Sequence, residues 1–138
     1  MNTLGIGIVG YGAIARVHAA ALALVPLIYP SLTLRPAVVA LTPGGTSSQS
    51  SALRDYPTVR QCTYTDLLAD PTVGAVLIST PTGLHAEHVA QAIAAGKHIM
   101  CEKPLTVDPD QSRALVAAAC PTGPCPPRCR PLVAPTLQ

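Results

Sequence analysis

Three small residues that follow an apolar run have the spacing of a phosphate-binding turn. Gly10, Gly12 and Ala15 form the pattern G-x-G-x-x-A between the run Leu4–Val9 and a helical stretch. Such a turn lets backbone N–H groups and a helix N-terminus bind a pyrophosphate. Gly10 would make the tight turn, Gly12 would leave room for the phosphates, and Ala15 would let the helix pack on the strand. We therefore predict a dinucleotide-binding turn made of Gly10, Tyr11, Gly12, Ala13 and Ile14.

The second expected strand ends without an acidic residue. Many NAD-binding domains place a carboxylate there, which binds the adenosine ribose hydroxyls. Here the strand ends in Ala40-Leu41-Thr42-Pro43, and hydroxyl residues and Arg54 follow. This arrangement tolerates a 2′-phosphate, so it slightly favours NADP over NAD and makes Thr42 a candidate cofactor contact. A serine-rich surface loop is the alternative interpretation.

A third block of polar residues follows the fourth expected strand and the helix after it. It contains Ser-Thr-Pro-Thr-Gly-Leu-His-Ala-Glu-His at residues 79–88 and Ala-Gly-Lys-His-Ile-Met-Cys-Glu-Lys-Pro at residues 95–104. Together with the glycine turn, these motifs resemble the Gfo/Idh/MocA family, the relatives of glucose–fructose oxidoreductase and inositol dehydrogenase. The resemblance covers residues 4 to about 119.

The resemblance implies a role for several of these residues. Thr80 and Pro81 are expected in the loop that passes beside the cofactor, and His85 orders the start of the following helix. Glu102 resembles the acid near the nicotinamide ribose. Lys103 resembles the active-site lysine, whose ammonium group stabilises the alkoxide of a sugar or polyol and helps to relay its proton while NAD or NADP takes the hydride. Pro104 is expected to fix the turn that presents Lys103, with a cis peptide bond as one way to do so.

Simpler interpretations exist for the same residues. Glu102 and Lys103 on their own also fit a solvated surface pair, and Tyr11 either covers the cofactor or packs against the turn. His85 and His88 have a spacing that can hold a metal, but no third ligand is evident, so we predict no metal site and expect His88 to face solvent.

The surrounding apolar runs and breakers predict strands that alternate with helices. Strands are expected at 4–9, 37–41, 60–64, 73–79 and 98–101, and helices at 13–24, 51–55, 66–69, 84–95 and 108–119. Pro26 and Pro30 should end the first helix and Gly96 the fourth, while Thr65 should cap the third helix and Asp108 the last. This order predicts an α/β fold, a Rossmann-type doubly wound parallel sheet that is incomplete at about five strands, over residues 1–119.

The composition changes abruptly at Cys120. Residues 120–138 hold six of the fifteen prolines and three of the five cysteines, so we expect a disordered tail and consider a frameshifted or mis-spliced end. Members of the family are more than twice as long and have a second domain that contacts the substrate. The leading hypothesis is therefore a truncated oxidoreductase. The alternatives are a non-catalytic nucleotide-binding module and a residual fold that acts only through protein contacts.

Charge and composition limit the partners. The net charge of +2 comes from Arg128 and Arg130, because residues 1–119 hold seven basic and seven acidic side chains. We therefore expect no nucleic-acid partner. No apolar stretch reaches membrane-spanning length and no secretory signal is evident, so a cytoplasmic protein with free thiols is expected. The oligomeric state is not predicted.

Overall fold

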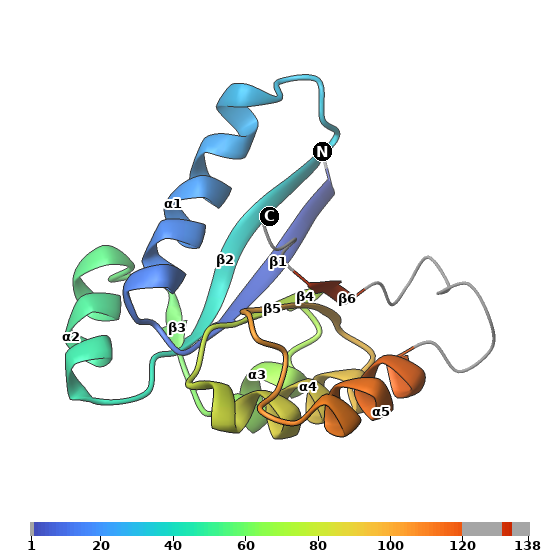
Figure 1. Ribbon diagram of the computed structural model, residues 1–138. Coiled ribbons are helices and arrows are strands. Elements are labelled where there is room, and N and C mark those ends of the chain that lie inside the picture. Colours follow the sequence, from blue (N-terminus) through green and yellow to red (C-terminus); the bar gives the residue numbers. More distant parts are fainter. Residues whose placement is uncertain (1, 120–130, 134–138) are drawn as a thin grey trace.

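A computed structural model describes residues 2–119 and 131–133 of the chain (Figure 1). A parallel sheet of six strands has the order β3-β2-β1-β4-β5-β6, the order of a Rossmann fold. The strands are β1 (Asn2–Val9), β2 (Leu34–Thr42), β3 (Arg60–Gln61), β4 (Ala75–Ile78), β5 (His98–Cys101) and β6 (Pro131–Val133). The helices are α1 (Ala13–Ile28), α2 (Thr46–Asp55), α3 (Tyr64–Ala69), the 3-10 turn η1 (Thr82–Leu84), α4 (His85–Ala94) and α5 (Pro109–Ala119).

Helices cover the sheet on two sides. In Figure 1, α1 and α2 lie on one side, and α3, α4 and α5 lie on the other. Strands that are covered on both faces need apolar residues at successive positions rather than at alternate ones. The run Ile6–Val9 and the run Val76–Ile78 meet this need, which is why both were recognisable as central strands.

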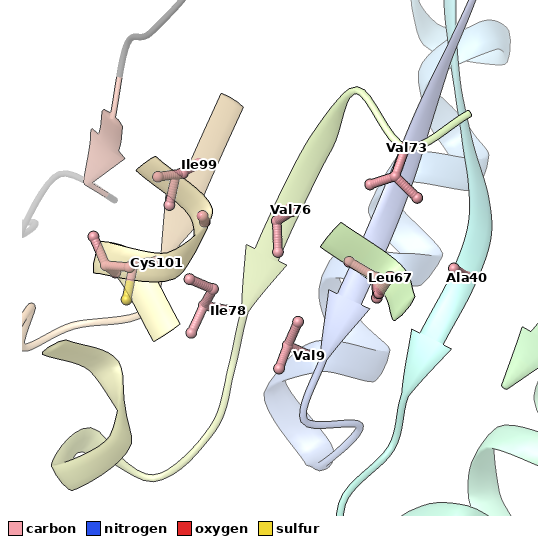
Figure 2. Packing of buried hydrophobic residues seen from close by; sticks show 10 residues of the cluster. Val9, Ala40, Leu67, Val73, Val76, Ile78, Ile99 and Cys101 are labelled. Carbon is pink, nitrogen blue, oxygen red and sulfur yellow. The ribbon is translucent and has the colours of Figure 1, made fainter. Parts of the chain in front are cut away.

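Two apolar clusters fill the spaces between the sheet and the helices. The cluster under α3 and α4 is shown in Figure 2 and consists of Val9, Ala40, Leu67, Val73, Val76, Ile78, Val89, Ala92, Ile99 and Cys101. The cluster under α1 and α2 consists of Ile6, Ile8, Tyr11, Ala15, Ala19, Leu41, Ala52 and Leu77. Ala15 is fully buried in the second cluster, so the small residue at this position lets α1 pack on the sheet as the sequence predicts.

Two of the predicted helix ends are confirmed. Asp108 caps α5, because its carboxylate Oδ1 accepts a hydrogen bond of 2.9 Å from the N–H of Asp110. Gly96 follows α4 with a φ of +66°, the left-handed conformation in which glycine commonly ends helices.

Other predicted ends are wrong, each for a local reason. Helix α1 runs past Pro26 to Ile28, and Arg35 donates hydrogen bonds to the carbonyls of Pro26 and Pro30 near its end. Thr63, not Thr65, caps α3 by accepting the N–H of Asp66. Helix α2 begins at Thr46 instead of 51, because the serine-rich segment expected as a loop is helical.

The sheet has one strand more than the five expected. Strand β6 pairs with β5 in parallel at the edge of the sheet, with Pro131 opposite Ile99. Residues 131–133 of the expected tail thus form an edge strand. Proline is tolerated there because it occupies the first position of an edge strand. The rest of the predicted tail, residues 120–130 and 134–138, lies outside the described residues, and the domain boundary at 119 stays a prediction.

Within the parts of the chain that the structure describes, no helix combines the length and apolar character needed to cross a membrane. Cys62 and Cys101 are both free thiols. Burial raises the pKa of the Cys101 thiol to about 12, so this cysteine is a core residue in its thiol form.

Candidate functional site

The glycine turn after β1 is tied to the end of β2. The N–H of Gly10 donates to the Thr42 carbonyl at 2.8 Å, and the N–H of Tyr11 donates to the Pro43 carbonyl at 3.0 Å. Gly10 has a φ of +80°. A Cβ atom there would lie 2.8 Å from the backbone oxygen of Ser79, the residue that follows β4. Gly10 therefore makes the tight turn that the sequence predicts, for both conformational and steric reasons.

The N-terminus of α1 is open. Gly12 is its N-cap residue, makes no side-chain cap, and is followed by no acidic residue in the first turn. A Cβ atom at Gly12 would meet nothing within 4 Å. The first N–H groups of a helix have no partner inside it, and the helix dipole adds partial positive charge. The end of α1 is thus a cradle in which backbone donors, with no side chain in front of them, can bind an anion.

Two cavities flank this cradle. The cavity on the α2 side is lined by Tyr11, Gly12, Ala13, Arg16, Ser47, Ser48 and Ser51. The cavity on the β4–β5 side has a volume of about 360 Å³ and is lined by Ile14, Ser79, Thr80, Pro81, Thr82, His85, Glu102 and Lys103. Nine of the eleven predicted site residues line one cavity or the other, and Gly10 and Thr42 support the turn between them.

Tyr11 packs against the turn, which is one of the two alternatives left open by the sequence. Its side chain is buried, meets Tyr56 edge to face, and donates a hydrogen bond of 3.3 Å to Asp55. Burial, helped by the charge of Asp55, raises the pKa of Tyr11 to about 12. The phenol therefore stays protonated and anchors the turn to the end of α2.

Asp55 holds two arginines near the α2-side cavity. Burial tends to raise the pKa of Asp55, but hydrogen bonds from Arg16 and Arg54 outweigh it and hold that pKa below its ordinary value. The Nε atoms of Arg16 and Arg54 lie 2.8 and 3.0 Å from its carboxylate oxygens. Arg16 also lines the cavity, so a guanidinium is oriented next to the serines of α2.

Two buried hydroxyl groups near the cradle lack partners within the described residues. They are Thr42 Oγ1, at the end of β2, and Ser79 Oγ, just after β4. A buried hydroxyl without a hydrogen bond is costly, so such groups commonly mark a place where a ligand or water completes the contacts. Together with the open space at Gly12, they show that the residues present fit a dinucleotide.

His85 joins the loop after β4 to the segment after β5. Its side chain is 1% exposed, with Nδ1 at 2.9 Å from the Pro104 carbonyl and Nε2 at 2.8 Å from the Thr80 carbonyl. Carbonyl oxygens only accept hydrogen bonds, so a ring nitrogen is the donor in each contact that is formed. His85 thereby holds two cavity walls together, which extends its predicted role at the start of α4.

Glu102 and Lys103 follow β5 and differ in their contacts. The Glu102 carboxylate oxygen Oε1 lies 2.5 Å from Nε2 of His18 on α1. Lys103 is exposed, lines the cavity, and has no hydrogen-bond or ion-pair partner within residues 2–119. By contrast, Lys97 donates to the carbonyls of Asp70 and Val73 and is a structural residue. The Lys103 ammonium is therefore available to a ligand, and the peptide bond to Pro104 is cis.

The expectation that His88 faces solvent is wrong. Its Nδ1 lies 3.0 Å from Thr80 Oγ1, and its ring meets Tyr64 edge to face at 4.7 Å. Burial lowers the pKa of His88 below its ordinary value. The neutral ring supports the Thr80 loop from beneath, because α4 turns this side chain toward α3 rather than outward.

Three residues of the site were missed by the sequence analysis: His18, Arg16 and Ser79. His18 follows Ile14 by four residues, and residues at this spacing share one face of a helix. A polar residue at that position relative to a predicted cavity residue was a signal that could have identified it. Arg16 follows Gly12 by four residues in the same way, whereas Ser79 is marked only by being the first residue after β4.

The fold and the site together define a Rossmann domain that binds a dinucleotide at the carboxyl ends of its strands. Comparison with known proteins gives the family. Residues 4–124 match the model of the Gfo/Idh/MocA family, described as an oxidoreductase family with an NAD-binding Rossmann fold, and the chain belongs to this family.

Several relatives carry established names. The chain is 32% identical over 122 residues to levoglucosan dehydrogenase from Pseudarthrobacter phenanthrenivorans (86% of this chain and 30% of the relative). It is 38% identical over 108 residues to inositol 2-dehydrogenase from Gluconacetobacter diazotrophicus (77% and 30%), and 31% identical over 122 residues to the NADP(+)-dependent D-xylose 1-dehydrogenase from Hypocrea jecorina (85% and 31%). A solved structure of levoglucosan dehydrogenase in complex with NADH and levoglucosan superposes with a TM-score of 0.77 at 30% identity (85% of this chain and 32% of that one).

The chain thus spans about a third of the length of these relatives.

Proposed function

We propose that this chain is the cofactor-binding part of an NAD(P)-dependent oxidoreductase that transfers hydride to or from a sugar or polyol. The observation that carries the proposal is the open N-terminus of α1 at Gly12, between a cavity rich in hydroxyls and a cavity lined by Lys103. The relatives named above act on levoglucosan, inositol and D-xylose, which supports a substrate with several hydroxyl groups.

The geometry supports one orientation of the cofactor. The pyrophosphate would bind at the N–H groups of residues 12–14, where the α1 dipole favours negative charge. The adenosine half would then occupy the α2-side cavity, and the nicotinamide half the cavity beside Thr80, Pro81 and His85. Glu102, an acceptor-only carboxylate, would bind the hydroxyl groups of the ribose attached to the nicotinamide.

When bound, the cofactor accepts or donates a hydride at the carbon that bears the reacting hydroxyl. Lys103 would lie beside the oxygen of that carbon, where its ammonium group donates a hydrogen bond that lowers the energy of a developing alkoxide. In reduction the ammonium would give its proton to this oxygen as the hydride arrives, and in oxidation the neutral amine would take the proton back. Lys103 has no partner among the residues that the structure describes, which supports this role, because the cation breaks no contact with them to reach the substrate.

We propose NADP rather than NAD as the preferred cofactor. Strand β2 ends in Leu41 and Thr42 without a carboxylate, and the cavity that follows is lined by Arg16, Ser47 and Ser48. A guanidinium and hydroxyl groups can bind a 2′-phosphate, which a carboxylate at this place would repel.

The proposal also includes the cellular location of the protein and the absence of a nucleic-acid partner. Balanced charge over residues 1–119 supports the absence of a nucleic-acid partner. Free thiols at Cys62 and Cys101 support a reducing compartment, so we place the protein in the cytoplasm.

Calorimetric titration of the purified chain with NADPH and NADH tests the proposal. We expect saturable binding of both, tighter for NADPH. Gly12→Asp places a carboxylate in the cradle and should abolish binding, whereas Gly44→Asn is a matched control at an exposed glycine outside both cavities. No binding by a folded chain would refute the proposal, and tighter binding of NADH would refute the cofactor preference alone.

A further inference from the structure

His18 connects the helix of the phosphate cradle to the segment that carries the proposed catalytic lysine. It lies one turn after Ile14 on α1, and its Nε2 atom is 2.5 Å from Glu102 Oε1, 84 residues later in the chain. Both side chains are largely buried, at 23% and 14% exposure. An ionised carboxylate can only accept, so Nε2 of His18 carries the proton of this hydrogen bond.

The contact leaves half of the Glu102 carboxylate free. Among the residues that the structure describes, His18 is the one hydrogen-bond partner of this carboxylate, and it engages Oε1 only. Glu102 lines the cavity next to Lys103. Because both oxygens are bonded to the same carbon, holding one of them narrows the positions open to the other, whereas a glutamate without such a contact would sample several rotamers.

We propose that His18 is a positioning residue, which holds Glu102 so that the second carboxylate oxygen accepts hydrogen bonds from the vicinal hydroxyls of the nicotinamide ribose. The inference rests on the proposed function, which assigns that half of the cofactor to the cavity lined by Glu102. A vicinal diol presents two O–H donors, and a fixed, acceptor-only carboxylate is the matching group.

A purely structural role for His18 makes a different prediction. His18 also lines an apolar groove, together with residues that include Leu22, Val25 and Met100. If His18 only fills this space, its replacement should lower the stability of the fold. It should then change the affinities for ligands with and without the second ribose by the same factor. The two roles are therefore separated by comparing ligands with and without the second ribose.

Two polar substitutions that differ in reach provide the test. The amide nitrogen of His18→Gln can take the place of Nε2, whereas that of His18→Asn is too short to reach Glu102. Calorimetry would measure the binding of NADH, ADP-ribose and ADP, of which only ADP lacks the second ribose. We expect His18→Asn to weaken NADH and ADP-ribose about tenfold and to leave ADP unchanged, since one charged hydrogen bond is affected. His18→Gln should stay near the wild type.

Val25→Ala is the matched control, because it alters the same groove without contacting Glu102. It should lower the melting temperature and leave all three affinities unchanged. Equal losses for the three ligands in His18→Asn, no loss at all, or failure of both His18 variants to fold would overturn the inference. A wild-type chain that binds none of the ligands would instead refute the proposed function, and the inference with it.

Discussion

At the scale of single residues, Gly10 and Gly12 are required for different reasons. Gly10 has a positive φ and no room for a Cβ atom, so it is needed for the fold. Gly12 has an ordinary φ and open space in front of it, so it is needed only if something binds there. The sequence motif treats the two glycines alike, and only their surroundings distinguish a structural from a binding role.

Gly10→Ala should therefore destabilise the chain, while Gly12→Ala should not. The left-handed backbone conformation alone costs a non-glycine residue about 1–3 kcal/mol, and the contact with the Ser79 carbonyl adds to it. Urea unfolding followed by circular dichroism measures the difference. Equal midpoints for the two variants would show that the turn at Gly10 relaxes without cost.

Asp70 makes the stability depend on acid pH. Hydrogen bonds from the hydroxyl and the N–H of Thr72, and then from Arg60, lower the pKa of Asp70 below its ordinary value of 3.8. A carboxyl group with a lowered folded-state pKa stabilises the fold above its unfolded pKa, and this contribution is lost as the pH falls through the folded pKa. Below pH 3.8 the unfolding free energy of Asp70→Asn should thus fall less steeply with falling pH than that of the wild type. Thr72→Val should reduce this pH dependence in part. Unfolding free energies with the same acid dependence in all three proteins would contradict the assignment.

Much of the site could be predicted at this scale, because residue types in a motif reveal which groups can bind. The turn, the Thr80 loop, Glu102 and Lys103 all lie at the two cavities or support them. For His18 the sequence offers only its spacing from Ile14, and for the burial of His88 it offers no comparable signal. Their roles depend on how α1 and α4 are rotated about their axes, and apolar periodicity defines this rotation only roughly when alanines surround the helix.

At the scale of elements, two helix ends followed the sequence because the residue that sets each of them acts locally. Asp108 and Gly96 act within their own turns, so their roles were predictable. Pro26 was misjudged because the groups that satisfy the end of α1 come from Arg35, on the next strand. A contact between elements can thus extend a helix past a proline that local rules would place at its end.

Asp108→Ala should destabilise the chain by about 1 kcal/mol, the usual value of an N-cap carboxylate. Asp110→Ala, two residues later, is the matched control. Asp110 is exposed, and within the described part of the chain its side chain pairs only with Arg113. Its loss should therefore change the unfolding free energy by at most a few tenths of a kcal/mol, about the value of an exposed ion pair. Denaturant unfolding of both variants measures which of them loses more unfolding free energy. A larger loss in Asp110→Ala would refute the capping role of Asp108.

At the scale of the whole molecule, the position of the site follows from the strand order. From β1 the chain proceeds outward to β2 and β3, then returns to place β4 on the other side of β1. The connections leave β1 and β4 on opposite faces of the sheet, and a crevice opens between their carboxyl ends. The glycine turn follows β1, Ser79 follows β4, and Glu102 follows β5, so the topology brings residues 10, 79 and 102 to one edge.

Because the proposed cofactor would contact segments after all four central strands, its binding should stabilise the whole fold. A ligand at a hundred times its dissociation constant raises the unfolding free energy by about 2.7 kcal/mol. In a domain of this size that corresponds to a rise in melting temperature of roughly 10 °C. Thermal unfolding with increasing NADPH measures it, and the Gly12→Asp variant should show no shift. A rise of equal size in that variant would mean that the stabilising ligand binds somewhere other than the cradle at the N-terminus of α1.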